Sequence, residues 1–393
     1  MSLNVSKVRQ DFTILNNGVI YLDNAATALT PKQVVEKEKE YYDEYNANIH
    51  RGVHRLTVRA SNEYAEAHKK VAKFIDAKPN NVFFTKNTTE SLNMLTMLAK
   101  KGSKIVVSDV EHHSNFLPWL RLKQKGVVDL DFISVSKDGS IDLAQAEKVC
   151  KDADIISITA ASNVLGNKMP LKDISKIARQ NNSFFIIDGA QFVPHVETSV
   201  KELNCDALAF SGHKMLGPTG TGVLWLKSPE NVEPLMLGGG TIKDVSLNSY
   251  TLGVLPDRFE AGTPNIAGAL GLGVAADYLR NVGVNNIEKH EKELMKFILD
   301  SLGDKVDLLG SSNIKDKLGV FSFNIKNISH HDVAALLDKK NICVRSGHHC
   351  CLPLHKKFNL QGTVRASLYL YNTQEEVEKF IESVRQIAKT FSR

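Results

Sequence analysis

The feature that most constrains the fold of this chain is a series of short apolar segments that alternate with helical stretches. These segments are rich in β-branched and aromatic residues and predict buried strands over residues 82–85, 104–108, 131–135, 155–159, 184–187, 207–210 and 222–226. Strands separated by helices predict an α/β fold with a mostly parallel, doubly wound sheet.

Beyond about residue 285 the pattern changes to shorter strands mixed with helices, which is typical of a smaller α+β unit. We therefore expect a large α/β domain over residues 20–275 and a small α+β domain formed by residues 1–19 and 276–393. We expect the boundary to fall inside a long helix between residues 270 and 290.

Composition excludes several classes of protein. The 393 residues are 42% hydrophobic and 24% charged, as in ordinary globular proteins, and the net charge of +5 comes from mixed signs, so we expect no nucleic-acid partner. No apolar run is long enough to span a membrane, and residues 1–10 lack the apolar core of a signal peptide, so the cytoplasm is the expected compartment. Five cysteines without framework spacing predict no structural disulfide.

Two motifs follow strands of the predicted sheet. Asp188 comes directly after the strand at 184–187, in Asp-Gly-Ala-Gln, and Lys214 ends the motif Ser-Gly-His-Lys after the strand at 207–210. Neighbouring strand ends face one crevice in such sheets, so the two side chains can converge on a ligand. An amine that forms an imine and a carboxylate that keeps a ring nitrogen protonated are the pair that pyridoxal phosphate requires. A capping Asp and a solvated loop Lys are the ordinary alternatives.

Hydroxyl side chains near these motifs are candidates for holding a phosphate group. Thr88 and Thr89 lie where a strand turns into a helix, and amide groups at a helix start favour anions. Ser211 and His213 flank the candidate lysine, and Thr263 in Gly-Thr-Pro is a weaker candidate. An ordinary capping box is the alternative explanation for the threonine pair.

Three more side chains suit a flat ligand and an anionic substrate. His112, in Glu-His-His-Ser-Asn, can stack on a ring and shuttle protons, unless it belongs to a polar surface loop. Asn163 can hold a phenolic oxygen or a carboxylate, or simply form a turn. Arg365 can grip a carboxylate through two parallel hydrogen bonds, or form a surface salt bridge.

The segment Arg-Ser-Gly-His-His-Cys-Cys at residues 345–351 is a second focus. Adjacent His and Cys residues suggest zinc, but structural zinc sites draw their ligands from separated pairs, so we expect no metal. A reactive thiol at Cys350 fits better, because Arg345, His348 and His349 would favour its thiolate form. A bystander cysteine in a loop is the alternative.

Taken in order, these motifs resemble those of the class V aminotransferase-like group of fold-type I pyridoxal-phosphate enzymes. Within that group the chain is similar to group II (SufS-type) cysteine desulfurases, because it carries Arg-x-Gly-His-His-Cys. The ordered set is specific, although Asp-Gly-Ala-Gln alone is not. The matching segments span nearly the whole chain, at residues 21–26, 51–54, 88–90, 111–115, 188–191, 211–214, 262–264, 345–350 and 365–367.

The resemblance implies a role for each matching residue. Lys214 would bind the coenzyme covalently and move protons at the substrate α-carbon, and Cys350 would accept the sulfur. Contacts to the coenzyme ring would come from Asp188 at its nitrogen, Gln191 at its phenolic oxygen, and His112 by stacking. The phosphate would be held by Thr88, Thr89, Ser211, His213 and, from the second subunit of a homodimer, Thr263. Substrate contacts would come from Asn163, which also touches the coenzyme, and from Arg345, Arg365 and His54.

The reaction that the resemblance implies converts L-cysteine to L-alanine, with the sulfur held as a persulfide on Cys350. The persulfide would pass to a carrier protein or to an iron–sulfur scaffold. The alternatives are a selenocysteine lyase or another pyridoxal-phosphate lyase of the same fold, which would not need Cys350, and a non-catalytic coenzyme-binding or scaffold protein. Cys351 departs from the family pattern, in which another small residue is usual, and could be inert or could trap the persulfide as a disulfide or polysulfide.

Overall fold

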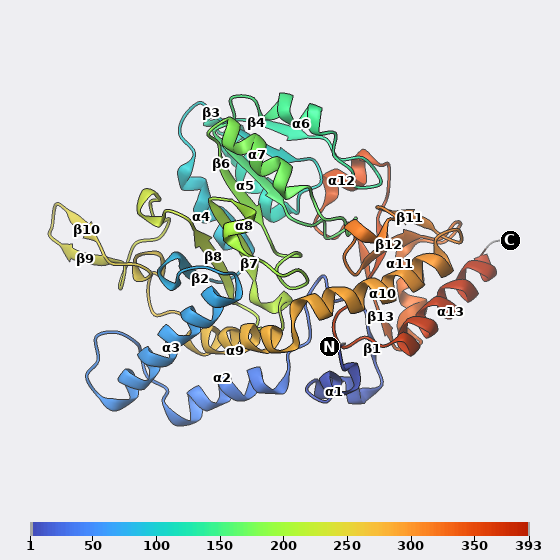
Figure 1. Cartoon of the computed structure of the whole chain (residues 1–393), viewed down its shortest axis with the longest axis horizontal. Helices are drawn as coiled ribbons and strands as arrows, with labels where there is room; N and C mark the ends of the chain where they lie inside the picture. Colours follow the sequence, from blue (N-terminus) through green and yellow to red (C-terminus); the bar gives the residue numbers. More distant parts are fainter. Residues whose placement is uncertain (1–2, 392–393) are drawn as a thin grey trace.

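The computed structural model describes residues 3–391 and is built on a large mixed sheet (Figure 1). Its seven strands run in the order β2-β8-β7-β6-β5-β3-β4, and β8 is antiparallel to both of its neighbours whereas the other pairs are parallel. The prediction of a mostly parallel sheet is therefore confirmed. The strands are β2 (Val82–Thr85), β3 (Ser103–Ser108), β4 (Val128–Ile133), β5 (Ile155–Thr159), β6 (Phe184–Asp188), β7 (Ala207–Ser211) and β8 (Gly222–Leu226).

Helices cover both faces of this sheet. Successive side chains of a strand point to opposite faces, and accordingly Phe185 and Ile187 of β6 pack in one apolar cluster while Ile186 packs in another. The first cluster includes residues of α6, α7 and α9, and the second includes residues of α4 and α5. The helices of this region are α2 (Lys32–Glu44), α3 (Arg55–Phe74), α4 (Thr88–Met94), α5 (His113–Gln124), α6 (Leu143–Cys150), α7 (Leu171–Gln180), α8 (Val200–Leu203) and α9 (Ile266–Val282).

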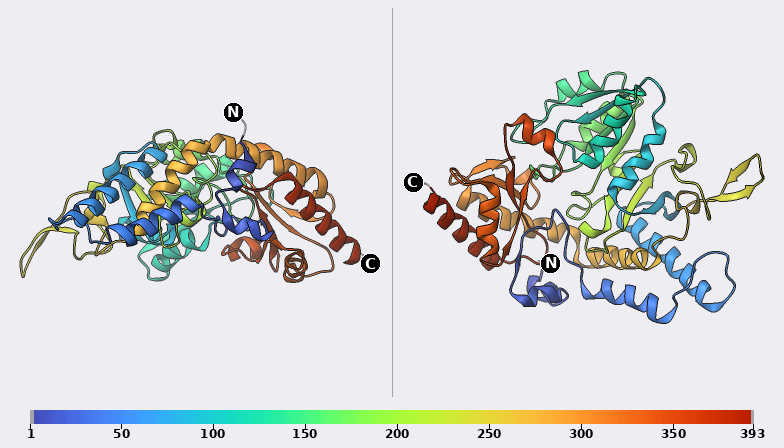
Figure 2. Two further views of the ribbon diagram at one scale, coloured as in Figure 1. Left: turned by 90° about the horizontal axis from the view of Figure 1, so that it is seen from below. Right: turned by 180° about the vertical axis from the view of Figure 1, so that it is seen from behind.

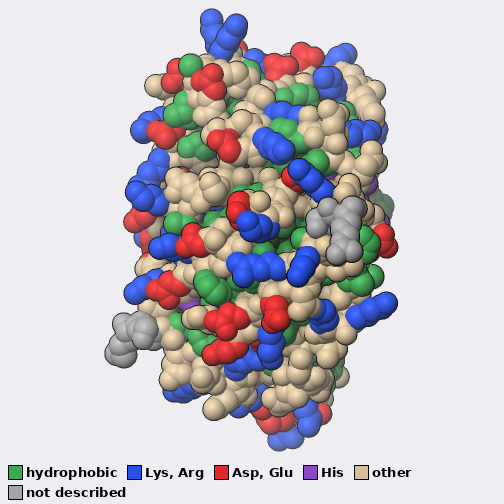
Figure 3. Space-filling view, turned by 90° about the vertical axis from the view of Figure 1, so that its right-hand side faces the viewer, with side chains coloured by type: hydrophobic (Ala, Val, Ile, Leu, Met, Phe, Trp, Pro, Cys, Tyr) green, Lys and Arg blue, Asp and Glu red, His purple; other side chains and the backbone are tan. Residues whose placement is uncertain are grey.

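The C-terminal part of the chain forms a second, antiparallel sheet in the order β11-β12-β15-β14. Its apolar cluster is separate from the two above and takes in α10, α11 and α13. On the outer face of this part, basic and acidic side chains are interspersed (Figure 3). The elements are α10 (Val284–Leu302), β11 (Asp307–Leu309), β12 (Val320–Asn324), α11 (His330–Asp338), β13 (Ile342–Cys343), β14 (Arg345–Gly347), α12 (Leu352–Lys357), β15 (Thr363–Ser367) and α13 (Gln374–Phe391).

The start of the chain touches both parts of the molecule. After the short helix α1 (Val5–Arg9), Phe12 packs in a cluster of the large sheet, whereas Leu22 packs in the C-terminal cluster. Between them, β1 (Ile20–Tyr21) pairs in parallel with β13. The division into domains at residues 20 and 275 stays a prediction.

Two features differ from the expectation. The long helix expected between residues 270 and 290 is two helices, α9 and α10, because Gly283 between them has φ +85°, which a helix does not accept. The hairpin of β9 (Ile242–Val245) and β10 (Tyr250–Leu252) was not predicted, since its strands are short and polar, and it projects from the body of the molecule (Figure 2). Among residues 3–391, no helix is both long and apolar enough to cross a membrane.

Candidate active site

A cavity of about 300 Å³ lies between the ends of the large-sheet strands and the C-terminal sheet. It brings together residues that are far apart in the sequence, as expected for the crevice of an open α/β sheet. Of the predicted site residues, all but Thr263 and His54 line it: Thr88, Thr89, His112, Asn163, Asp188, Gln191, Ser211, His213, Lys214, Arg345, Cys350 and Arg365.

Asp188 and Lys214 supply an acidic and a basic group to the lining of the cavity. Asp188 is the last residue of β6, is buried, and accepts a hydrogen bond of 2.9 Å from the amide of Ala190. Burial raises the pKa of Asp188, and burial lowers the pKa of Lys214 to about 8 although the nearby Asp188 acts in the opposite direction. The Lys214 amine therefore populates its neutral, nucleophilic form near neutral pH.

Hydroxyl groups at the start of α4 form one wall. The Thr88 amide donates to Ser211 Oγ at 2.9 Å, and the Thr88 and Ser211 hydroxyls lie 2.7 Å apart. This close approach depends on Gly222 in β8, because a Cβ added there would lie 2.5 Å from Asn87 Cα. The donors and the glycine together make a small, polar recess that suits an anion.

His112 presents a flat ring to the cavity. It caps α5, and its Nδ1 accepts a hydrogen bond of 3.1 Å from the Ser114 amide. Burial lowers the pKa of His112 to about 3, so the ring is neutral at physiological pH. A neutral, fixed imidazole is suited to stacking on an aromatic ligand.

Glu111 lies beneath His112 and was not predicted as a site residue. Its carboxyl is 2% exposed and accepts hydrogen bonds from the Asn115 side chain at 2.7 Å and the Thr159 amide at 3.0 Å. Burial raises the pKa of Glu111 to about 7. This carboxyl ties α5 to β5 and so fixes the segment that carries His112. The sequence signal was its place beside the histidine pair, but burial cannot be read from that motif.

Arg365 and Arg345 bring positive charge to the cavity from strands β15 and β14 of the C-terminal sheet. Arg365 is 2% exposed, its Nη1 donates to the Asn163 carbonyl at 3.1 Å, and its buried Nε has no partner within residues 3–391. Burial lowers the pKa of Arg365 to about 10, so it stays charged at neutral pH. Arg345 forms an ion pair of 2.8 Å with Asp23, which also lies 3.4 Å from Arg365 Nη2. A buried cation with a free donor is what a carboxylate substrate needs.

Asp23 and Gln191 make contacts beside the cavity that the motifs did not indicate. Asp23 was not predicted as a site residue, although it binds both arginines. Gln191 Nε2 donates to the Ala25 carbonyl at 2.6 Å, and its predicted contact with a phenolic oxygen stays a prediction.

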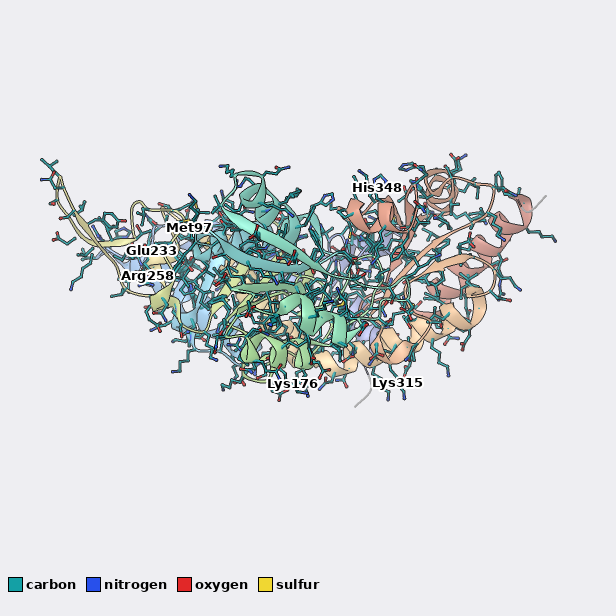
Figure 4. The ribbon with its side chains drawn as sticks, turned by 90° about the horizontal axis from the view of Figure 1, so that it is seen from above. Met97, Lys176, Glu233, Arg258, Lys315 and His348 are labelled. Carbon is teal, nitrogen blue, oxygen red and sulfur yellow. The ribbon has the colours of Figure 1, made fainter. Side chains whose placement is uncertain are left out.

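Cys350 lies at the mouth of the cavity on a tightly held loop. Its side chain is exposed, and its neighbour His348 lies at the surface of the molecule beside α12 (Figure 4). One expected source of charge is missing, because burial lowers the pKa of His349 to about 2 and leaves it neutral. Arg345 remains a positively charged side chain that lines the same cavity as Cys350.

Thr263 and His54 lie outside the cavity. Thr263 is exposed, accepts a hydrogen bond of 3.3 Å from the Asn48 side chain, and lines a separate cavity of about 200 Å³. His54 is also exposed and caps α3. Their predicted roles stay predictions.

This chain is similar to known proteins over nearly its whole length. The Aminotransferase class-V family model matches residues 20–380. A protein of Pyrococcus abyssi named "Probable cysteine desulfurase" is 46% identical over 391 residues, which are 98% of this chain and 97% of that protein. The apo structure of cysteine desulfurase from Thermococcus onnurineus NA1 matches with a TM-score of 0.96 and 46% identity over 99% of both chains. The cysteine desulfurase CsdA of Escherichia coli matches with a TM-score of 0.92 and 31% identity over 100% of both chains. The predicted fold class is thereby confirmed.

Proposed function

This chain belongs to the aminotransferase class-V family, and from that membership we propose that it is a cysteine desulfurase, which converts L-cysteine to L-alanine and takes the sulfur as a persulfide on Cys350. Enzymes of this family depend in general on pyridoxal 5′-phosphate. The observation that carries the proposal is that a half-buried amine, a buried carboxylate and an exposed thiol, from Lys214, Asp188 and Cys350, line one cavity.

The residues of the cavity fit pyridoxal 5′-phosphate. The recess beside Gly222, lined by the Thr88 and Ser211 hydroxyls, would hold the phosphate group, and His213 and Thr89 line the same cavity. Asp188 would hold the ring nitrogen, and Lys214 would hold the aldehyde carbon covalently. When bound, the coenzyme withdraws the electrons released at the substrate α-carbon.

Arg365 and Lys214 would bind and activate the amino-acid substrate. Arg365 keeps its charge when buried, and its unpartnered Nε suits the carboxylate of L-cysteine. With its pKa lowered to about 8 by burial, Lys214 can take a proton from the substrate α-carbon and return one later. Asn163, whose carbonyl accepts from Arg365, orients that guanidinium.

Cys350 would then accept the sulfur. Its thiolate attacks the substrate sulfur, an S–S bond forms as the substrate Cβ–S bond breaks, and the bonding electrons stay with the carbon fragment. Uptake of a proton at Cβ, followed by return of a proton to the α-carbon from Lys214, completes alanine. Attack on sulfur calls for a soft nucleophile, and a thiolate near Arg345 meets that need.

We also infer membership of group II, and a homodimer in which Thr263 serves the partner's cavity. We further infer that His54 contacts the substrate and that the persulfide passes to a carrier protein or an iron–sulfur scaffold. Exposed apolar side chains on and beside the β9–β10 hairpin support the dimer, since a second copy would cover them: Leu235, Leu237, Val245, Leu247 and Val254. A cytoplasmic location stays a prediction.

Mass spectrometry after exposure to L-cysteine tests the proposed function. The protein should gain sulfur on Cys350, release alanine, and be fixed to its coenzyme at Lys214 by borohydride. The Cys350→Ala variant should lose turnover, whereas Cys343→Ala, which changes a half-buried cysteine of β13, should keep it. Alanine release that persists in Cys350→Ala would contradict the persulfide step. Faster turnover of selenocysteine in that same variant would favour the lyase alternative.

A further inference from the structure

Cys351, next to the proposed sulfur acceptor, is fully buried and faces away from the solvent. Its Sγ lies 3.2 Å from the Val110 carbonyl oxygen and 3.3 Å from the Glu111 carbonyl oxygen. The thiol therefore donates a hydrogen bond that is shared between these two carbonyl oxygens, which belong to the segment that leads into α5. Burial raises the pKa of Cys351, so it stays a protonated donor and not a thiolate.

The loop around Cys350 holds an unfavourable backbone conformation. His349 and Cys350 both have positive φ, +51° and +54°, a region that residues other than glycine rarely adopt. Two such residues in succession persist only where surrounding contacts hold them. The conformation aims the Cys350 side chain toward the cavity while Cys351 packs inward.

Contacts from two sides hold this conformation. On one side the Asn163 side chain donates to the His349 carbonyl at 2.7 Å. On the other side the His113 amide donates to the Cys350 carbonyl at 2.8 Å, and the Leu352 amide donates to His113 Nε2 at 3.1 Å. The Cys351 thiol adds a side-chain anchor that reaches the Glu111 carbonyl, directly before His112.

We propose that Cys351 is a positioning residue that anchors the acceptor loop to the segment carrying His112, so that the Cys350 thiol is held over the coenzyme cavity; this inference rests on the proposed function. Cys351 is not a second sulfur carrier, because its thiol is enclosed and protonated. A disulfide between Cys351 and Cys350 would be strained. Adjacent Cα atoms lie about 3.8 Å apart, closer than the roughly 4.4–6.8 Å that a disulfide spans.

Two variants separate anchoring from sulfur transfer. Cys351→Ala removes the donor, and Cys351→Ser keeps a donor in a smaller side chain. In the holoenzyme, we expect Cys351→Ala to slow the single-turnover formation of the Cys350 persulfide about tenfold, with the KM for L-cysteine and the coenzyme spectrum unchanged. Cys351→Ser should recover most of the rate, and Cys343→Ala should match the wild type. Equal loss in the Ala and Ser variants, or extra sulfur on Cys351, would overturn the proposal.

Hydrogen exchange of the resting protein gives a readout that does not depend on catalysis. Amides of peptides covering residues 110–117 and 348–357 should exchange about tenfold faster in Cys351→Ala than in wild type and near the wild-type rate in Cys351→Ser. Unchanged exchange in Cys351→Ala would overturn the anchoring role even if its activity fell. If the wild type fails to desulfurate L-cysteine while exchange responds as expected, the proposed function fails and the anchor stands.

Discussion

Replacing Gly222 with alanine tests whether the α4 segment and β8 together form the phosphate recess. The added Cβ would lie 2.5, 2.7 and 2.8 Å from the Cα, N and C atoms of Asn87, whereas ordinary contacts begin at 3.4 Å. Relief requires a separation of about 0.9 Å, the difference between 2.5 and 3.4 Å, and the atoms in the way are backbone. They cannot rotate aside as the end of a side chain could.

A shift of that size reaches the hydroxyl wall. Asn87 precedes Thr88, whose amide donates to Ser211 Oγ at 2.9 Å, so the displacement would stretch this hydrogen bond beyond its normal length. Overpacking of a well-packed site costs about 1–3 kcal/mol. If that cost is taken from the binding free energy of pyridoxal 5′-phosphate, the affinity should fall roughly 5- to 150-fold, since each 1.4 kcal/mol is about tenfold.

The measurement is a spectroscopic titration of the apo protein with the coenzyme, together with thermal unfolding of both forms. Gly238→Ala is the matched control. A Cβ added at Gly238 would meet no atom within 4 Å, and the backbone there does not have the positive φ that would strain an alanine. We expect that control to bind like the wild type. A Gly222→Ala protein that binds the coenzyme with wild-type affinity and melts at the wild-type temperature would refute the proposed recess.

Three further outcomes follow from the buried charges. The Lys317 amine donates to the Leu165 carbonyl, and burial lowers the pKa of Lys317 to about 7. In the unfolded chain the pKa of this lysine is about 10.5, so between pH 7 and pH 10.5 the unfolded state binds more protons than the folded state. The free energy of urea unfolding should therefore rise with pH across that window in the wild type and rise less in Lys317→Met. Arg365→Lys should raise the KM for L-cysteine about tenfold or more in steady-state kinetics, because the paired hydrogen bonds to a carboxylate are lost; an unchanged KM would place the carboxylate elsewhere. Asp188→Asn should lower turnover on the order of 100-fold while coenzyme stays bound, and full turnover would remove its role at the ring nitrogen.

Local patterns in the sequence were sufficient to predict the strands that lead to Asp188 and Lys214. Their apolar runs are short and bounded by glycine, and β2, β5 and β8 have the bounds that were expected. Helix starts were harder to predict. Helix α3, for example, begins at Arg55, where the His54 side chain caps it. A capping histidine is not a common start signal, so the pattern could not indicate it.

The inner arrangement of the site depended on contacts across the chain. Asp23 meets Arg345 and Arg365, which are more than 300 positions away, and no spacing in the sequence relates them. Burial decided the charge of His349 and the inertness of Cys351, although both stand in a motif that suggests reactivity. Solvent exclusion is a property of the packed molecule, and so are the pKa shifts that follow from it.

The amino-acid order alone thus determined the fold class and the residue types that meet at the strand ends. Strand periodicity can be recognised within a short segment, and the carboxyl ends of neighbouring parallel strands always lie at the same edge of a sheet. Which of those residues are buried, charged or held in strained conformations was decided by the tertiary structure. Desolvation and backbone anchoring both arise only when distant segments close around the same cavity.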